Sequence, residues 1–100
     1  MAKADEDWDE DEIRVCVDQY VEVLKRGGAK RSVTKDVFLA RAEKRLPKRN
    51  SGAVARRMGN ISHIMAEAGC DPVIGWTPQA HVGPTNSERI HAMLVEHGVI

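Results

Sequence analysis

Residues 53–68, AVARRMGNISHIMAEA, repeat their apolar side chains at helical intervals. Steps of four, three and four residues place Val54, Met58, Ile61 and Met65 on one face of a helix. The polar side chains of the opposite face and its flank are Arg56, Arg57, Asn60 and His63. We therefore predict a helix whose apolar face packs into the core and whose polar face lies in solvent.

A second helix is expected immediately before this one, from about residue 34 to residue 46, with Pro47 closing it. The connecting residues 47–52 are few and polar, and either Asn50 or Ser51 can cap the helix that follows. Two helices joined by so short a turn are typical of a helix-turn-helix, in which the second helix enters the major groove of DNA.

The first helix is predicted to begin at Asp9 and to end at Gly27 and Gly28. Asp9 and Glu12 have the spacing of a capping box, and Trp8 and Ile13 occupy the positions of a hydrophobic staple. This helix should therefore have a well-defined start.

Gly69 is expected to end the helix of residues 53–68. Residues 73–83 contain prolines and glycines and predict an extended strap, with Trp76 packed inward. A fourth helix should begin with a capping box at Thr85 and Glu88 and end at Gly98. The expected fold is all-α: a tri-helical, helix-turn-helix-like bundle with an extended strap and a fourth C-terminal helix. This single domain spans residues 8–100, after a disordered acidic tail of residues 1–7.

Charge is segregated along a chain whose formal net charge is zero. Residues 1–24 carry nine acids and two bases, residues 25–57 carry twelve bases and two acids, and residues 58–100 carry one base and four acids. The middle third therefore has ten positive charges in excess, which favours a polyanionic partner. A solvated basic face is the alternative for such a run.

Several function classes find little support in the sequence. An acidic start and the lack of a long apolar run predict a cytoplasmic protein without a membrane partner. Cys16 and Cys70 lack a metal-binding spacing and are expected to be reduced and structural. The four histidines match no zinc pattern, and Ser62 and His63 point apart on a helix. We expect no catalytic residues, no metal and no cofactor.

The predicted outer face of residues 53–68 carries side chains of the types that recognise nucleic acid. Arginine can donate two hydrogen bonds to guanine or phosphate, and asparagine can pair in the same way with adenine. Arg56, Arg57 and Asn60 are therefore expected to read or position bases, while the preceding turn holds phosphates. The complete set of expected DNA-binding residues is Lys48, Arg49, Ser51, Gly52, Arg56, Arg57, Asn60 and His63.

Two families share parts of this pattern. The acidic WDEDE of residues 8–12 ahead of an arginine-rich third helix resembles the Myb/SANT arrangement. The RNSGAVARRMGNIS of residues 49–62, followed by Gly69, Ile74-Gly75-Trp76 and Pro78, is similar to the N-terminal helical domain of McrA-type HNH restriction endonucleases. The resemblance covers about residues 8–83, with Trp76 in place of the family's tyrosine and a glycine at position 59 inside a helix.

The resemblance implies DNA targeting rather than cleavage, because these 100 residues contain no HNH nuclease motif. The expected function is a duplex-DNA-binding module that acts as a stand-alone regulator or as an accessory to a nuclease on another chain. The alternative is a protein-interaction module that regulates a restriction or nucleic-acid enzyme, which the acidic N-terminus favours. An acidic tail that folds over the basic segment and tunes DNA affinity would combine the two functions.

Overall fold

The computed structural model describes residues 8–27, 44–47, 49–73 and 76–100. These residues form three helices, α2 (Glu10–Gly27), α4 (Ser51–Glu67) and α5 (Pro84–Glu96), and contain no strand. The predicted all-helical class is therefore confirmed for the described part of the chain. The predicted helix of residues 34–46 lies outside that part except at its end, where Lys44 and Arg45 are helical and Leu46 is buried.

The start of α2 follows the sequence prediction. The Asp9 N–H donates to Oε1 of Glu12 at 3.1 Å, and the Glu12 N–H donates to Oδ1 of Asp9 at 2.8 Å. This reciprocal pair is the capping box, and it satisfies two backbone donors at the end of the helix. Trp8 and Ile13 are both buried in the same apolar cluster, as expected for a hydrophobic staple.

The two ends of α4 are also fixed by local chemistry. Asn50 is the N-cap, and its side chain accepts a hydrogen bond of 2.8 Å from the Ala53 N–H. At the other end Gly69 has a φ of +81°, and the Gly69 and Cys70 N–H groups donate to Ala66 and Met65. This is a Schellman motif, and its left-handed residue favours glycine.

The start of α5 differs from the prediction. Thr85 lies inside the first turn of the helix, and the N-cap is Gly83, which makes no side-chain capping bond. Pro84 occupies the first turn, where its fixed φ suits a helix and its missing N–H removes a donor that would otherwise need a partner. The predicted capping box of Thr85 and Glu88 is therefore wrong, because proline starts the helix two residues earlier.

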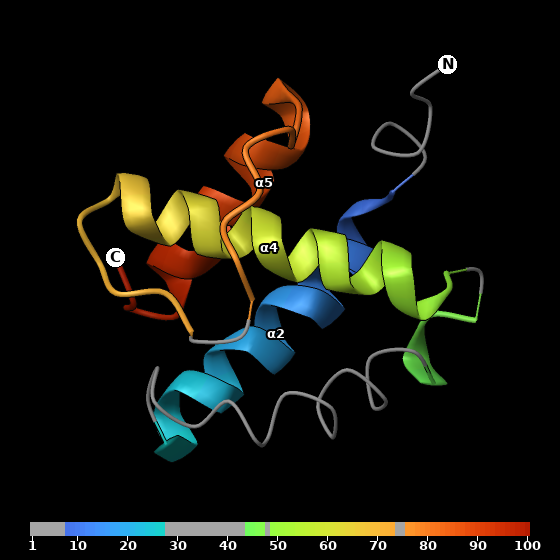
Figure 1. Cartoon of the computed structure of the whole chain (residues 1–100), viewed down its shortest axis with the longest axis horizontal. Coiled ribbons are helices and arrows are strands. Elements are labelled where there is room, and N and C mark those ends of the chain that lie inside the picture. The colour runs from blue at the N-terminus through green and yellow to red at the C-terminus, as the bar shows by residue number, and fades with distance from the viewer. Residues whose placement is uncertain (1–7, 28–43, 48, 74–75) are drawn as a thin grey trace.

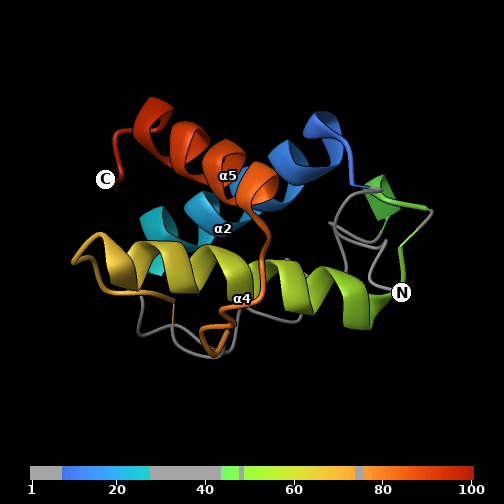
Figure 2. The same ribbon diagram turned by 90° about the horizontal axis from the view of Figure 1, so that it is seen from above.

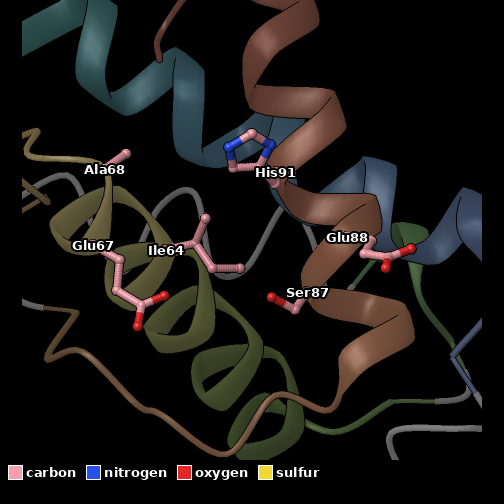
Figure 3. A pocket seen from close by; sticks show the side chains of 6 residues that line it. All are labelled: Ile64, Glu67, Ala68, Ser87, Glu88 and His91. Carbon is pink, nitrogen blue, oxygen red and sulfur yellow. The ribbon is translucent and has the colours of Figure 1, made fainter.

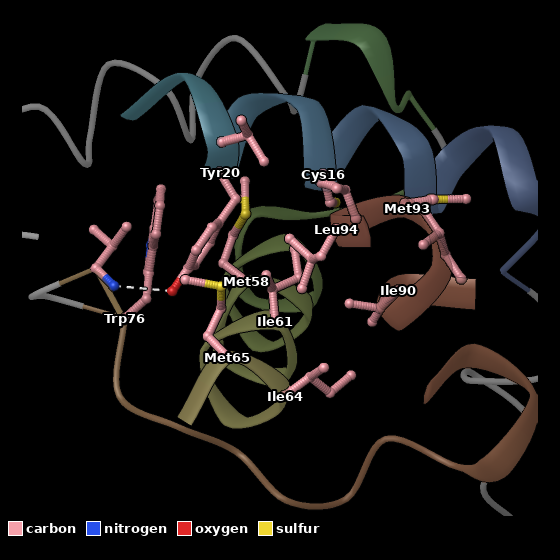
Figure 4. Packing of buried hydrophobic residues seen from close by; sticks show 14 of the residues in the cluster. Cys16, Tyr20, Met58, Ile61, Ile64, Met65, Trp76, Ile90, Met93 and Leu94 are labelled. Atoms are coloured by element: carbon pink, nitrogen blue, oxygen red, sulfur yellow. Dashed lines mark hydrogen bonds between the residues drawn. The ribbon is translucent and has the colours of Figure 1, made fainter. Parts of the chain in front are cut away.

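All three helices share one core (Figure 4). Tyr20 stacks on Trp76 with ring centroids 5.5 Å apart and an interplanar angle of 27°. The Tyr20 hydroxyl accepts a hydrogen bond from the Val73 N–H at 2.9 Å and lies 2.8 Å from the Ser62 hydroxyl. The expected inward packing of Trp76 is confirmed, since it is 3% exposed. Other large side chains in the core are Ile13, Met58, Ile61, Met65, Ile90, Met93 and Leu94.

Helix α4 is covered on two sides. Figure 2 shows α2 and α5 on one side of α4 and the chain leading into α5 on the other, and Figure 1 shows that chain crossing α4. Residues 76–83 are neither helix nor strand in this structure. The Gln79 N–H donates to the Gly59 carbonyl at 3.0 Å, so the crossing segment is attached at the middle of α4.

Gly59 permits this close crossing. A Cβ atom at position 59 would lie 2.5 Å from Cγ of Gln79 and 2.8 Å from the carbonyl oxygen of Thr77. Glycine disfavours a helix, but it is required at position 59 because the backbone of the crossing segment leaves no space for a side chain there.

Candidate functional site

Arg57 does not lie on the outer face of α4, contrary to the sequence prediction. Its residue exposure is only 2%, and its Nη1 donates to Oδ1 of Asn60 at 3.0 Å. A buried guanidinium needs partners, and this one also lies over the Trp8 ring, with its Cζ 4.6 Å from the ring centroid. The side chain therefore joins Trp8 to α4 and is not presented for base reading.

Asn60 is also buried, with an exposure of 0%. Its Nδ2 donates to the Gln79 carbonyl at 2.7 Å, while its Oδ1 accepts from Arg57. Together with the Gly59 carbonyl, this side chain holds both the N–H and the C=O of Gln79. The predicted role of Asn60 at adenine is corrected: Gln79 of the crossing segment and Arg57 of α4 already use the two ends of its amide group.

Arg49 is turned inward as well. Its Nη2 donates to Oε1 of Glu12 at 2.7 Å and its Nε donates to Oε2 at 3.1 Å, so the two groups form a two-point ion pair. The two side chains are only 14% and 13% exposed. Cζ of Arg49 lies 4.5 Å from the centroid of the Trp8 ring.

Trp8 is therefore the centre of a polar cluster made by residues far apart in the sequence. Its ring contacts two guanidinium groups, those of Arg49 and Arg57, and its carbonyl accepts a hydrogen bond of 3.2 Å from Nη1 of Arg89. Because Trp8 precedes the capping residue Asp9 of α2, these contacts tie the start of that helix to α4 and α5. We call Trp8, Glu12, Arg49 and Arg57 the Trp8 cluster.

Arg56 is exposed, as predicted, and so is Gly52 in the first turn of α4. Two further exposed bases, Lys44 and Arg45, were not among the expected site residues although they precede the same turn. Lys48 and the side chain of Ser51 lie outside the described part of the structure.

These exposed groups gather at one end of the molecule. Figures 1 and 2 both place residues 44–47 beside the start of α4 and away from the C-terminus of the chain. The sequence from residue 44 to residue 66 contains six bases and no acid, and α4 has no acidic residue in its first turn. We call Lys44, Arg45, Gly52 and Arg56 the basic end. It combines exposed cations with the N-terminus of a helix, which carries partial positive charge.

The histidines are not gathered into a site. His63 is half-buried, and its Nε2 lies 3.3 Å from Oε2 of Glu67, one turn along α4. His97 lies 2.9 Å from Asp18 and links the end of α5 to α2. Among the described residues, no group of three or more histidine, cysteine, aspartate or glutamate side chains could hold a metal ion.

A shallow depression lies between α4 and α5 (Figure 3). It is lined by Ile64, Glu67, Ala68, Ser87, Glu88 and His91. Two carboxylates in this lining would repel phosphate, so the depression does not extend the basic end. No described helix is long and apolar enough to cross a membrane.

Cys16 is fully buried, and the charged groups of the Trp8 cluster are near enough to act on its thiol. Burial raises the pKa of its thiol from 9.0 to about 12, although the nearby charge of Arg57 lowers it. Burial likewise raises the pKa of the Tyr20 hydroxyl above its ordinary value of 10.0. Both groups are therefore held in their neutral forms in the folded protein.

We expect the folded protein to lose stability as the pH rises from about 9 towards 12, because a raised folded-state pKa means that the unfolded chain releases its proton first. The stabilisation is fully present below pH 9. Melting temperatures measured at pH 7 and pH 10 would test this, with Cys16→Ala expected to show a smaller decrease.

An aromatic disulfide reagent at pH 8 should modify Cys70 before Cys16. Equal labelling rates in the folded protein would contradict the buried position of Cys16.

Sequence reasoning missed the Trp8 cluster and the two hydrogen bonds that join Gln79 to Gly59 and Asn60. The sequence held one signal for each: Trp8 stands just before the N-cap of the first helix, and Gly59 stands next to Asn60 inside a predicted helix. No periodicity in one helix reveals a partner that lies 37 residues away, as for Arg49 and Glu12. Comparison of the chain with family models, with curated proteins and with solved structures gave no match.

Proposed function

We propose that this chain is a DNA-binding module that contacts the phosphate backbone through its basic end. The observation that carries the proposal is the exposure of Lys44, Arg45 and Arg56 at one end of a fold whose residues 44–66 include no acid. Exposed arginine and lysine side chains supply most of the affinity for duplex DNA, because each phosphate contact releases bound counterions.

The geometry favours phosphate contacts over base reading. Of the three residues expected to read bases, Arg57 and Asn60 are engaged inside the fold and Arg56 remains exposed. The first turn of α4 also suits a phosphate, because helix N-termini present backbone amides and Gly52 has no side chain to block an approach. In this proposal the helix-turn-helix-like half of the fold positions the module on a duplex, as a regulator or as a targeting accessory to a nuclease.

Removal of one exposed basic side chain of the protein is expected to weaken DNA binding in a salt-dependent way. For Arg56→Ala, the slope of log affinity against log salt should become shallower by roughly one, since each phosphate contact contributes about 0.9. Fluorescence anisotropy on a random duplex across a salt series measures this slope. Lys25→Ala is the matched control, because it removes one exposed positive charge from the far end of α2.

The two substitutions separate a site from a general charge effect. Equal losses in Arg56→Ala and Lys25→Ala would show that the basic end has no special part in binding. A wild-type protein that ignores duplexes even in dilute buffer would overturn the proposed function and would favour the protein-interaction module.

A further inference from the structure

The ion pair between Arg49 and Glu12 has the geometry with which arginine binds a phosphate. Two nitrogen atoms of one guanidinium, Nε and Nη2, donate to the two oxygen atoms of one carboxylate, at 3.1 Å and 2.7 Å. The planar donor fork of arginine fits carboxylate and phosphate oxygens in this same parallel manner. Glu12 therefore fills the position that a phosphate would take on Arg49.

Arg49 lies within the basic segment of the chain, although its side chain is paired with Glu12. Arg49 lies between the exposed Lys44 and Arg45 on one side and the first turn of α4 on the other, and its N–H donates to the Leu46 carbonyl at 2.9 Å. It is thus within the acid-free run of residues 44–66, yet its charge faces the start of α2.

Glu12 is held in place by its own helix. The capping box fixes it to Asp9, and the neighbouring Trp8 ring lies against the guanidinium of Arg49. The carboxylate is therefore preorganised for the arginine, and Arg49 is only 14% exposed while the pair is closed. A ligand that needs Arg49 must displace a carboxylate that is already aligned.

We propose that Glu12 is an internal competitor for phosphate at Arg49 and that it sets the resting affinity of the module for DNA. This regulation rests on the proposed function of the basic end. When a duplex docks on that end, a phosphate replaces the Glu12 carboxylate in the Arg49 fork, and the start of α2 loses its contact with residue 49. The competition lowers the affinity for DNA while Glu12 is paired with Arg49. A ligand reaches Arg49 only if its negative charge is strong enough to displace the Glu12 carboxylate.

Glu12→Gln is the direct test. Glutamine keeps an oxygen for the capping bond to Asp9 but loses the charge that holds Arg49, so the helix start should persist. DNA affinity should rise roughly tenfold, the scale of one charge-assisted hydrogen bond that binding no longer has to break, and the salt slope should stay as in the wild type, because the contact between Arg49 and a phosphate forms in both proteins. The same anisotropy assay gives both numbers, and circular dichroism checks that the variant is folded.

Asp11→Asn is the matched control, because Asp11 is exposed in the same helix turn and its neutralisation changes the net charge by the same amount. It should raise the affinity only by the small general effect of one lost acid. If Glu12→Gln and Asp11→Asn raise the affinity equally, the competition does not exist.

Arg49→Ala completes a double-mutant cycle. In the wild-type background its effect on affinity should be small, because Arg49 gains a phosphate only by losing Glu12, whereas in the Glu12→Gln background it should remove the gain. Equal effects in the two backgrounds would overturn the inference and leave the basic end intact. Failure of every variant to bind a duplex at low salt would instead overturn the proposed function and this inference with it.

Discussion

Arg57→Ala is expected to lower the free energy of unfolding by about 3 kcal/mol, whereas Arg56→Ala should change it by less than about 0.5 kcal/mol. The two arginines are neighbours in one helix and differ in their surroundings. Arg57 is buried between the Trp8 ring and the Asn60 amide, and Arg56 is exposed. Truncation of Arg57 leaves the buried Oδ1 of Asn60 without this donor and opens a cavity beside Trp8.

Urea denaturation followed by circular dichroism measures both variants. The same pair separates stability from function, because Arg56→Ala should weaken DNA binding in a protein of normal stability. Arg57→Lys is a useful third variant: lysine keeps the charge but lacks the planar group that lies over the ring, so it should recover only part of the loss. Equal stability of the Arg56 and Arg57 alanine variants would contradict the buried position of Arg57.

Gly59→Ala is expected to destabilise the fold by roughly 2 kcal/mol, even though alanine favours a helix by about 1 kcal/mol over glycine. The added Cβ would lie 2.8 Å from a backbone oxygen, that of Thr77, so the crossing segment must move away. That movement would weaken the bonds from Gln79 to Gly59 and from Asn60 to Gln79. These two losses and the overlap should exceed the gain in helix propensity.

Gly52→Ala is the control within the same helix. A Cβ at position 52 would come no closer than 3.4 Å to a neighbouring atom, the Asn50 side-chain oxygen, which is an ordinary contact. This variant should be unchanged or slightly more stable in the same denaturation experiment. A Gly59→Ala protein as stable as Gly52→Ala would show that the crossing segment does not press on α4.

The features that could be predicted from sequence are those set by neighbouring residues. The capping box of Asp9 and Glu12, the cap at Asn50 and the glycine after α4 all depend on contacts within a few residues. The apolar steps from Val54 to Met65 also placed the core face of α4 correctly.

The outer face of α4 was predicted wrongly because a periodicity argument assumes that a helix has one buried side. Helix α4 is packed by α2 and α5 on one side and by residues 76–83 on the other, so Asn60 and Ser62 are buried as completely as Ile61. Polar residues can be buried when distant partners satisfy them, as Gln79 does for Asn60 and Tyr20 does for Ser62. Those partners lie in other elements, and no local pattern identifies them.

The hydrogen bonds between α4 and Gln79 also limit how a DNA duplex can approach this protein. Because residues 76–83 lie across the middle of α4, the side of the helix that they cover cannot contact a groove of DNA. If the basic end binds a duplex as proposed, the contact would therefore be made through the first turns of α4 rather than along the whole length of the helix.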